Sequence, residues 1–227
     1  MRRIIFVAVV CAFVAVPVLA DTVTFKGGYG PWQTGQGGEF TLDPSLGLEW
    51  VLSYYVPATK DQAPPTPYMG TFQTFCLEAS EHISSNGTFT AVLNDKAVNG
   101  GVGPAGDPLS VGAAWLYEQF AKGTLVGYDY SNTGVGRTTS ASALQNAIWA
   151  LEGEGGSINA TYNTMLVGQF GSIASAKLDN MGQYKVKVLN LYTLAGGLAQ
   201  DALVLVPVPG AVLLGAIGLI ADGRKLR

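Results

Sequence analysis

Short stretches rich in β-branched and aromatic residues set the strongest limit on how this chain can fold. Four of them lie in the first half, each bounded by Gly, Pro, Asn or Asp: GEFTLDP (38–44), EWVLSYYV (49–56), TFQTFCLE (71–78) and GTFTAVL (87–93). Segments of this length and composition are typical of β-strands. Further along, YKVKVLNLYT alternates apolar residues with Lys185 and Lys187, which predicts a half-buried strand. The proline-rich stretch at 57–70 predicts an exposed loop before the third strand.

Helical patterns interrupt these strands. In PLSVGAAWLYEQFAK, Asp107 is the expected N-cap, Pro108 the first helical residue and Gly123 the stop. One stripe of this helix is apolar: Leu109, Ala113, Leu116 and Phe120. A further helix is expected within 159–178.

The segment RTTSASALQNAIWALEG predicts a helix that starts after Thr139 or Ser140 and stops at Gly153. Its apolar stripe is Ala141, Leu144, Ile148 and Leu151. Gln145 and Trp149 lie one turn apart on a neighbouring stripe, so Gln145 borders the buried face. Together the patterns predict an α+β fold: a β-rich, sandwich-like or barrel-like body with an inserted helical subdomain.

Composition excludes several classes of function. The formal net charge is −3, so the chain has no basic field to hold a phosphate backbone, and we expect no nucleic-acid partner. His82 is the only histidine and the acidic residues are scattered, so no metal site is expected. The glycine-rich GGVGPAG lacks the lysine of a phosphate-binding loop, and no cofactor is implied.

Both ends of the chain carry targeting patterns. Met1-Arg2-Arg3, the apolar run from Ile4 to Val16 and the site Val18-Leu19-Ala20 predict a signal peptide over residues 1–20. An apolar run from Leu203 to Ala221 is followed by a basic end. A transmembrane anchor that leaves the bulk of the protein outside explains this run.

This tail also resembles the PEP-CTERM sorting signal, in which a Pro-x-Pro motif precedes an apolar helix and a basic end. Pro207-Val208-Pro209 stands where that family has Pro-Glu-Pro. The resemblance implies an exosortase-type processing enzyme and attachment to the membrane by the C-terminal helix. We therefore expect an exported protein at the cell surface or in the extracellular matrix, with a main domain over 21–202 and a sorting segment over 203–227.

Removal of the leader, which contains Cys11, leaves Cys76 as the only cysteine. An internal disulfide is then impossible. A cysteine enzyme needs a base, and His82 follows too closely on the same segment to face the thiol across a cleft. What remains is an inert buried thiol, which packs as a small apolar group, or a covalent bond to another kind of side chain.

Two short motifs favour the covalent bond. Phe75-Cys76-Leu77-Glu78 and Leu144-Gln145-Asn146-Ala147-Ile148-Trp149 resemble the two signatures of the bacterial thioester domain, also called the TQXA domain. The resemblance covers roughly residues 38 to 195, and Leu144 stands where the family has threonine. It implies a thioester between the Cys76 sulfur and the Gln145 carbonyl, and an adhesin that captures amine-bearing partners, typically a lysine. Each molecule reacts once, so the protein is not an enzyme.

The residues around the motifs suggest supporting roles. Phe75, Trp149, Phe72 and Tyr117 are candidate shields against water. Strand alternation puts Glu78 on the same face as Cys76, where it can relay protons. Two alternatives stay open: a crosslink that serves only as a staple, and a noncovalent matrix protein that binds exopolysaccharide through exposed aromatics such as Trp32, Tyr54 and Tyr55.

Overall fold

The computed structural model describes residues 21–26, 32–34, 37–61, 69–84, 86–98, 106–132 and 135–207. The predicted signal peptide lies outside the described residues, as do Val208, Pro209 and the rest of the predicted sorting helix. None of the helices within the described ranges has the length and apolar character needed to cross a membrane.

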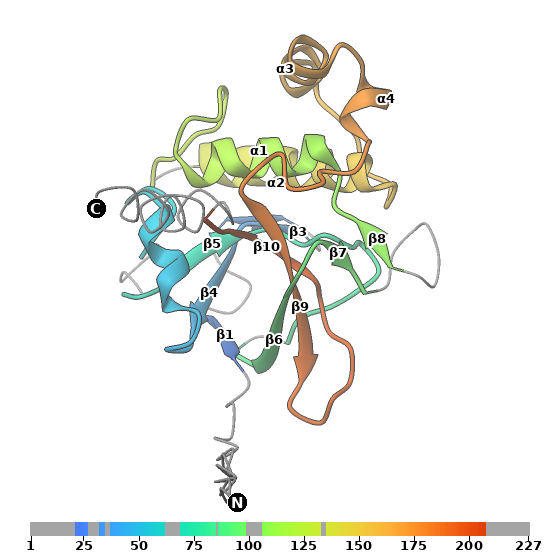
Figure 1. Ribbon diagram of the computed structural model, residues 1–227. Coiled ribbons are helices and arrows are strands. Elements are labelled where there is room, and N and C mark those ends of the chain that lie inside the picture. Colours follow the sequence, from blue (N-terminus) through green and yellow to red (C-terminus); the bar gives the residue numbers. More distant parts are fainter. Residues whose placement is uncertain are drawn as a thin grey trace, which may run out of the picture.

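A six-stranded antiparallel sheet forms the body of the protein (Figure 1). Its spatial order is β10-β9-β6-β1-β4-β5. The strands are β1 (Thr22–Lys26), β4 (Phe40–Pro44), β5 (Phe72–Thr74), β6 (Thr88–Asn94), β9 (Val186–Thr193) and β10 (Ala202–Leu205). The longest pairing joins β6 and β9, with a register that runs from Phe89 opposite Thr193 to Asn94 opposite Val188.

The two edge strands of this sheet approach each other and almost close it into a barrel. Leu203 N donates to Phe75 O at 3.2 Å, and Leu77 N donates to Asp201 O at 2.9 Å. Between these bonds, Cys76 forms a bridge with Ala202. This line of contacts, residues 74–78 against 200–203, is called the seam below. A barrel-like, sheet-rich body with a few helices confirms the coarse fold expectation.

Two helices run side by side across one end of the barrel: α1 (Val111–Ala121) and α2 (Gly136–Glu152) (Figure 1). Beyond them lie α3 (Ala160–Phe170) and α4 (Ile173–Ala176). The short strands β2 (Gln33–Thr34) and β3 (Gly37–Gly38) pair with each other and pack on α2. A second small pair consists of β7 (Lys96–Ala97) and β8 (Asp107–Pro108).

The core lies between the barrel and the α1–α2 layer. The apolar stripes predicted for both helices are buried there: Leu109, Ala113, Leu116, Phe120, Ala141, Leu144, Ile148 and Leu151. They pack in one cluster with the barrel residues Phe25 and Leu42. Helix α2 ends as predicted at Gly153, which adopts a left-handed conformation with φ of 83° that glycine adopts without strain.

The predicted starts of both helices were wrong. Helix α1 begins after Ser110, whose side chain accepts a hydrogen bond from Ala113 N, while Asp107 and Pro108 lie in β8. Helix α2 begins at Gly136, before the expected caps Thr139 and Ser140. Pairing with a neighbouring strand outweighed the local capping signal in α1.

The predicted strand at 49–56 was also wrong. Residues Glu49–Tyr54 form a 3₁₀ helix, η1. Leu48 and Val51 are buried while Trp50 is exposed, so the inward positions follow a three-residue spacing instead of strand alternation.

The barrel also extends further along the chain than expected. Leu203, Val204 and Leu205, which were assigned to the sorting segment, lie buried in β10. The hydrophobic run from Leu203 therefore begins as part of the core, and the folded body continues at least to Val206.

Candidate functional site

The side-chain carboxamide of Gln145 lies against the backbone of Cys76. Cys76 N donates to Gln145 Oε1 at 3.1 Å, and Gln145 Nε2 donates to Cys76 O at 2.7 Å. Both partners are buried, with 4% of Cys76 and 1% of Gln145 exposed. The two bonds close a ring that puts the carboxamide carbon opposite the Cα that bears the thiol.

The seam holds Cys76 in place. Its two neighbours are tied to the β10 side of the barrel, Phe75 through its carbonyl and Leu77 through its N–H. Thr74 Oγ1 adds a bond of 2.5 Å to Leu203 O. Because backbone bonds flank the cysteine on both sides, its position is set by the barrel and not by a free loop.

Helix α2 carries Gln145 and is anchored near both ends. Near its start, Arg137 Nε and Nη2 bind both oxygens of Glu39 at 2.9 and 2.5 Å, and neither side chain is exposed. At its last residue, Glu152 accepts a bond of 2.5 Å from Ser110 Oγ at the start of α1. These contacts fix the position of α2 and, with it, the position of Gln145 relative to the barrel.

Two glycines allow the close approach of α2 to the barrel. A Cβ on Gly37 would lie 2.6 Å from Gln145 Cγ and 2.7 Å from Trp149 Cη2. Gly38 has a φ of 127°, which glycine adopts without penalty, and its N–H donates to Gln145 Oε1 at 3.5 Å. No side chain fits between the β3 backbone and the carboxamide.

The carboxamide oxygen thus faces two backbone N–H groups, one from Cys76 and one from Gly38. Such donors stabilise the negative charge that develops on a carbonyl oxygen when a nucleophile attacks its carbon. The two donors are thus aimed at the oxygen that would become charged if a nucleophile attacked the Gln145 carbonyl carbon.

The thiol borders a small and largely apolar space. A cavity of about 10 Å³ adjoins Cys76, and its lining is largely apolar: Phe40, Leu42, Thr74, Phe75, Cys76, Ile83, Gln200 and Ala202. A water in this space would find few hydrogen-bond partners. Burial, followed by the negative charge of Glu81, raises the pKa of Cys76 above its usual value.

The expected shielding residues take different places. The ring of Trp149 lies against Gly37 beside Gln145, and it is partly buried. Phe75 is fully buried next to the cysteine and meets Tyr117 edge-on at 6.5 Å between ring centroids. Tyr117 donates to Gln73 O at 2.9 Å, so it supports Phe75 from the core. Phe72 instead packs on Tyr55.

Glu78 lies in a group of acids. One oxygen of Glu78, one of Glu81 and one of Asp201 all lie within 4.8 Å of one another. Burial, followed by Glu81, raises the pKa of Glu78 to about 9, so a proton stays on it at neutral pH. Burial also raises the pKa of Asp201 to about 6. Of the acids near the thiol, Glu81 is the one whose charge acts on Cys76.

Several of these contributors were missed from the sequence. Gly37 and Gly38 belong to a glycine-rich run that looked like part of a loop and a strand. Glu81 and Asp201 were counted among scattered acids. Only the clustering of QTGQGGEF gave a local hint, because glycines next to a strand often mark a close approach of backbone to another element.

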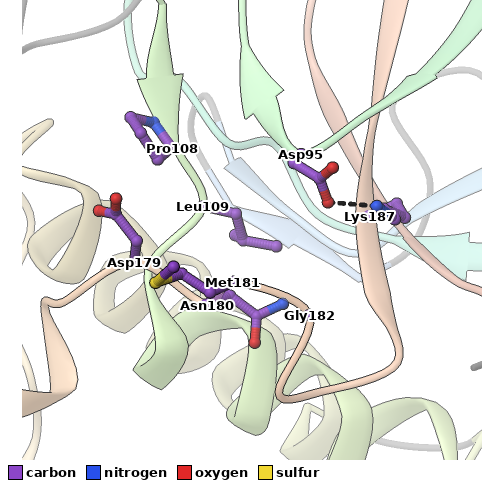
Figure 2. A pocket seen from close by; sticks show the side chains of 8 residues that line it. All are labelled: Asp95, Pro108, Leu109, Asp179, Asn180, Met181, Gly182 and Lys187. Atoms are coloured by element: carbon purple, nitrogen blue, oxygen red, sulfur yellow. Dashed lines mark hydrogen bonds and ion pairs between the residues drawn. The ribbon is translucent and has the colours of Figure 1, made fainter.

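A larger hollow lies elsewhere, between the β7–β8 pair and the chain that follows α4 (Figure 2). Its volume is about 380 Å³. Figure 2 shows Asp95 joined to Lys187 on one side and Asp179 on the other, with Met181 and Asn180 along the floor. Neither Cys76 nor Gln145 lines it.

The aromatics named for saccharide binding are mostly unsuited to it. Only 3% of Trp32 and 6% of Tyr55 are exposed. The Cζ atom of the Arg137 guanidinium lies 3.9 Å from the centroid of the Trp32 ring. The hydroxyl of Tyr55 forms a hydrogen bond with the hydroxyl of Tyr117. Tyr54 alone of the three is exposed, next to Trp50.

Comparisons of the chain with models of protein families, with curated proteins and with solved structures found no match.

Proposed function

We propose that the chain is an exported surface protein in which Cys76 and Gln145 form an internal thioester that captures amine-bearing partners. The observation that supports this most strongly is the pair of reciprocal hydrogen bonds between the Gln145 carboxamide and the Cys76 backbone. These two residues are distant in the sequence and were paired from the motif resemblance alone.

Formation of the bond needs no outside reagent. The Cys76 sulfur attacks the Gln145 carbonyl carbon, the C–N bond breaks, and the amide nitrogen leaves as ammonia with the thiol proton. The N–H groups of Cys76 and Gly38 hold the charged oxygen during the reaction. Because the fold already holds the two groups near each other, the reaction does not have to overcome the entropy loss of bringing them together.

Capture reverses the roles at the same carbon. A partner amine attacks the carbonyl of Gln145, the C–S bond breaks, and one amine proton passes to the Cys76 sulfur. The result is an amide between Gln145 and the partner. A bond of this kind does not dissociate, which benefits a surface protein under flow.

The burial of Gln145 favours one alternative, in which the thioester is a staple that only stabilises the fold. With 1% of Gln145 exposed, an amine reaches the carbonyl only if a covering side chain moves. Trp149, which is partly buried, is the side chain best placed to do so. A staple would close a loop of 70 or so residues and stabilise the fold by roughly 4 kcal/mol.

Treatment of the native protein with methylamine separates the two functions. A reactive thioester adds methylamine to Gln145 and releases one titratable thiol at Cys76, and peptide mapping locates both changes. A staple resists methylamine until the protein is denatured. The control is Gln145→Ala, which can neither form the bond nor be labelled at this position. Labelling of the native protein that persists in Gln145→Ala rules out the proposal.

A further inference from the structure

The acids at the seam come from both of its sides. Glu78 and Glu81 follow Cys76, and Asp201 directly precedes β10. Glu78 and Asp201 are 2% and 1% exposed, so the group is not a solvated surface patch. Asp201 Oδ2 accepts a bond of 2.6 Å from Val98 N, which fixes its orientation.

Glu78 is the unusual member of this group. Both of its carboxyl oxygens are buried and have no hydrogen-bond donor in the described part of the chain. One oxygen each of Glu81 and Asp201, which are acids as well, lies near this carboxyl group. Burial of several acids together is unfavourable unless a shared proton or a positive charge compensates their repulsion.

We propose that Glu78, Glu81 and Asp201 bind a divalent cation of the size of Ca²⁺. Ca²⁺ takes several oxygen ligands in a flexible geometry at about 2.3–2.6 Å, and the three carboxyl oxygens lie within 4.8 Å of one another, close enough to share one ion. Mg²⁺ demands near-ideal octahedral geometry and gives up its water ligands reluctantly, so it suits a set of protein carboxylates less well. The cluster contains no histidine or cysteine, so it does not suit Zn²⁺.

The position of the site gives the cation a structural role. Two hydrogen bonds already join the sides of the seam here, Leu77 N to Asp201 O and Gln200 Nε2 to Glu78 O, both at 2.9 Å. A cation bound by acids from both sides holds the two edges of the barrel together next to Cys76. This site does not depend on the thioester, because neither Cys76 nor Gln145 supplies a ligand.

Thermal unfolding of the EDTA-treated, dialysed protein tests the site. We expect the melting temperature to rise with CaCl₂ concentration, and to rise less with MgCl₂. Terbium supplies a second signal, because bound Tb³⁺ replaces Ca²⁺ and luminesces when nearby tyrosines or tryptophans are excited. Glu78→Gln keeps the shape of the side chain and removes its charge, so Ca²⁺ affinity should fall by at least about tenfold.

Glu49→Gln is the matched control, because Glu49 is exposed on η1 and should leave the Ca²⁺ response intact. If Glu78→Gln does not fold, Glu81→Gln, at a partly buried position, takes its place. Cys76→Ala separates this site from the thioester, because its Ca²⁺ response should persist. The site would be refuted if millimolar Ca²⁺ left the melting temperature of the wild type unchanged and Glu78→Gln raised it. That result would show that the acids share protons instead. Equal responses to Ca²⁺ in the wild type and Glu78→Gln would also refute the site.

Discussion

Replacing Gly37 with alanine tests the geometry of the Cys76–Gln145 pair without changing either residue. The added Cβ would lie 2.6 Å from Gln145 Cγ, which falls about 0.8 Å short of the 3.4 Å at which ordinary contact begins. On its other side is the Trp149 ring at 2.7 Å. The backbone of Gly37 does not adopt a positive φ, so the effect comes from packing alone.

The size of the effect follows from this overlap. Overpacking in a dense core costs about 1–3 kcal/mol of stability. A displacement near 1 Å at a reacting group lowers the rate by about a hundredfold. We therefore expect Gly37→Ala to fold, to lose about 1–3 kcal/mol of unfolding free energy in urea, and to contain far less thioester by intact-mass spectrometry.

Gly168→Ala is the matched control for this experiment. Gly168 lies on the exposed face of α3, and a Cβ there meets nothing within 4 Å. It should raise stability by roughly 0.5–1 kcal/mol, because alanine favours a helix more than glycine does, and should leave the thioester content unchanged. Full thioester in Gly37→Ala, at wild-type stability, would refute the close contact between α2 and β3.

Two further predictions concern the anchors of α2. Arg137→Ala leaves Glu39 buried without its partner and should lower the free energy of unfolding in urea by about 3–5 kcal/mol. Lys26→Ala is the control, because it breaks the half-exposed pair with Asp43 and should cost only about 0–1 kcal/mol. Equal losses in the two variants would contradict the anchoring role of Arg137. Burial raises the pKa of Glu152 to about 8, above that of a glutamate in the unfolded chain, so between these two values the folded state holds an extra proton. The free energy of unfolding should therefore fall as the pH rises from about 5 to 8, by at most about 1.4 kcal/mol per pH unit. Glu152→Gln should remove this part of the pH dependence, and an unchanged profile would show that other groups cause it.

Local patterns predicted much of the fold. β4, β6, β9 and the buried stripes of α1 and α2 followed from spacing, because alternation and helical periodicity are properties of neighbouring residues. The 3₁₀ helix η1 was mistaken for a strand because its aromatic content resembles that of one. β10 was hidden in a hydrophobic run that reads equally well as an anchor.

The site was predictable only in part. Cys76 and Gln145 were singled out by their motifs, and the structure places the Gln145 carboxamide against the Cys76 backbone; the thioester itself stays a prediction. The ion pair Arg137–Glu39 and the group of acids that contains Glu78 and Asp201 bring together residues far apart in the sequence, so no local periodicity predicts them. The same holds for Gly37, whose role depends on a helix more than a hundred residues later.

Intact-mass spectrometry of the folded, purified protein detects the Cys76–Gln145 thioester itself. We expect a mass lower by one ammonia than the mature sequence requires, and no such deficit in Cys76→Ala or Gln145→Ala. A full, unmodified mass in the wild type, together with one thiol that reacts after unfolding, would contradict the thioester.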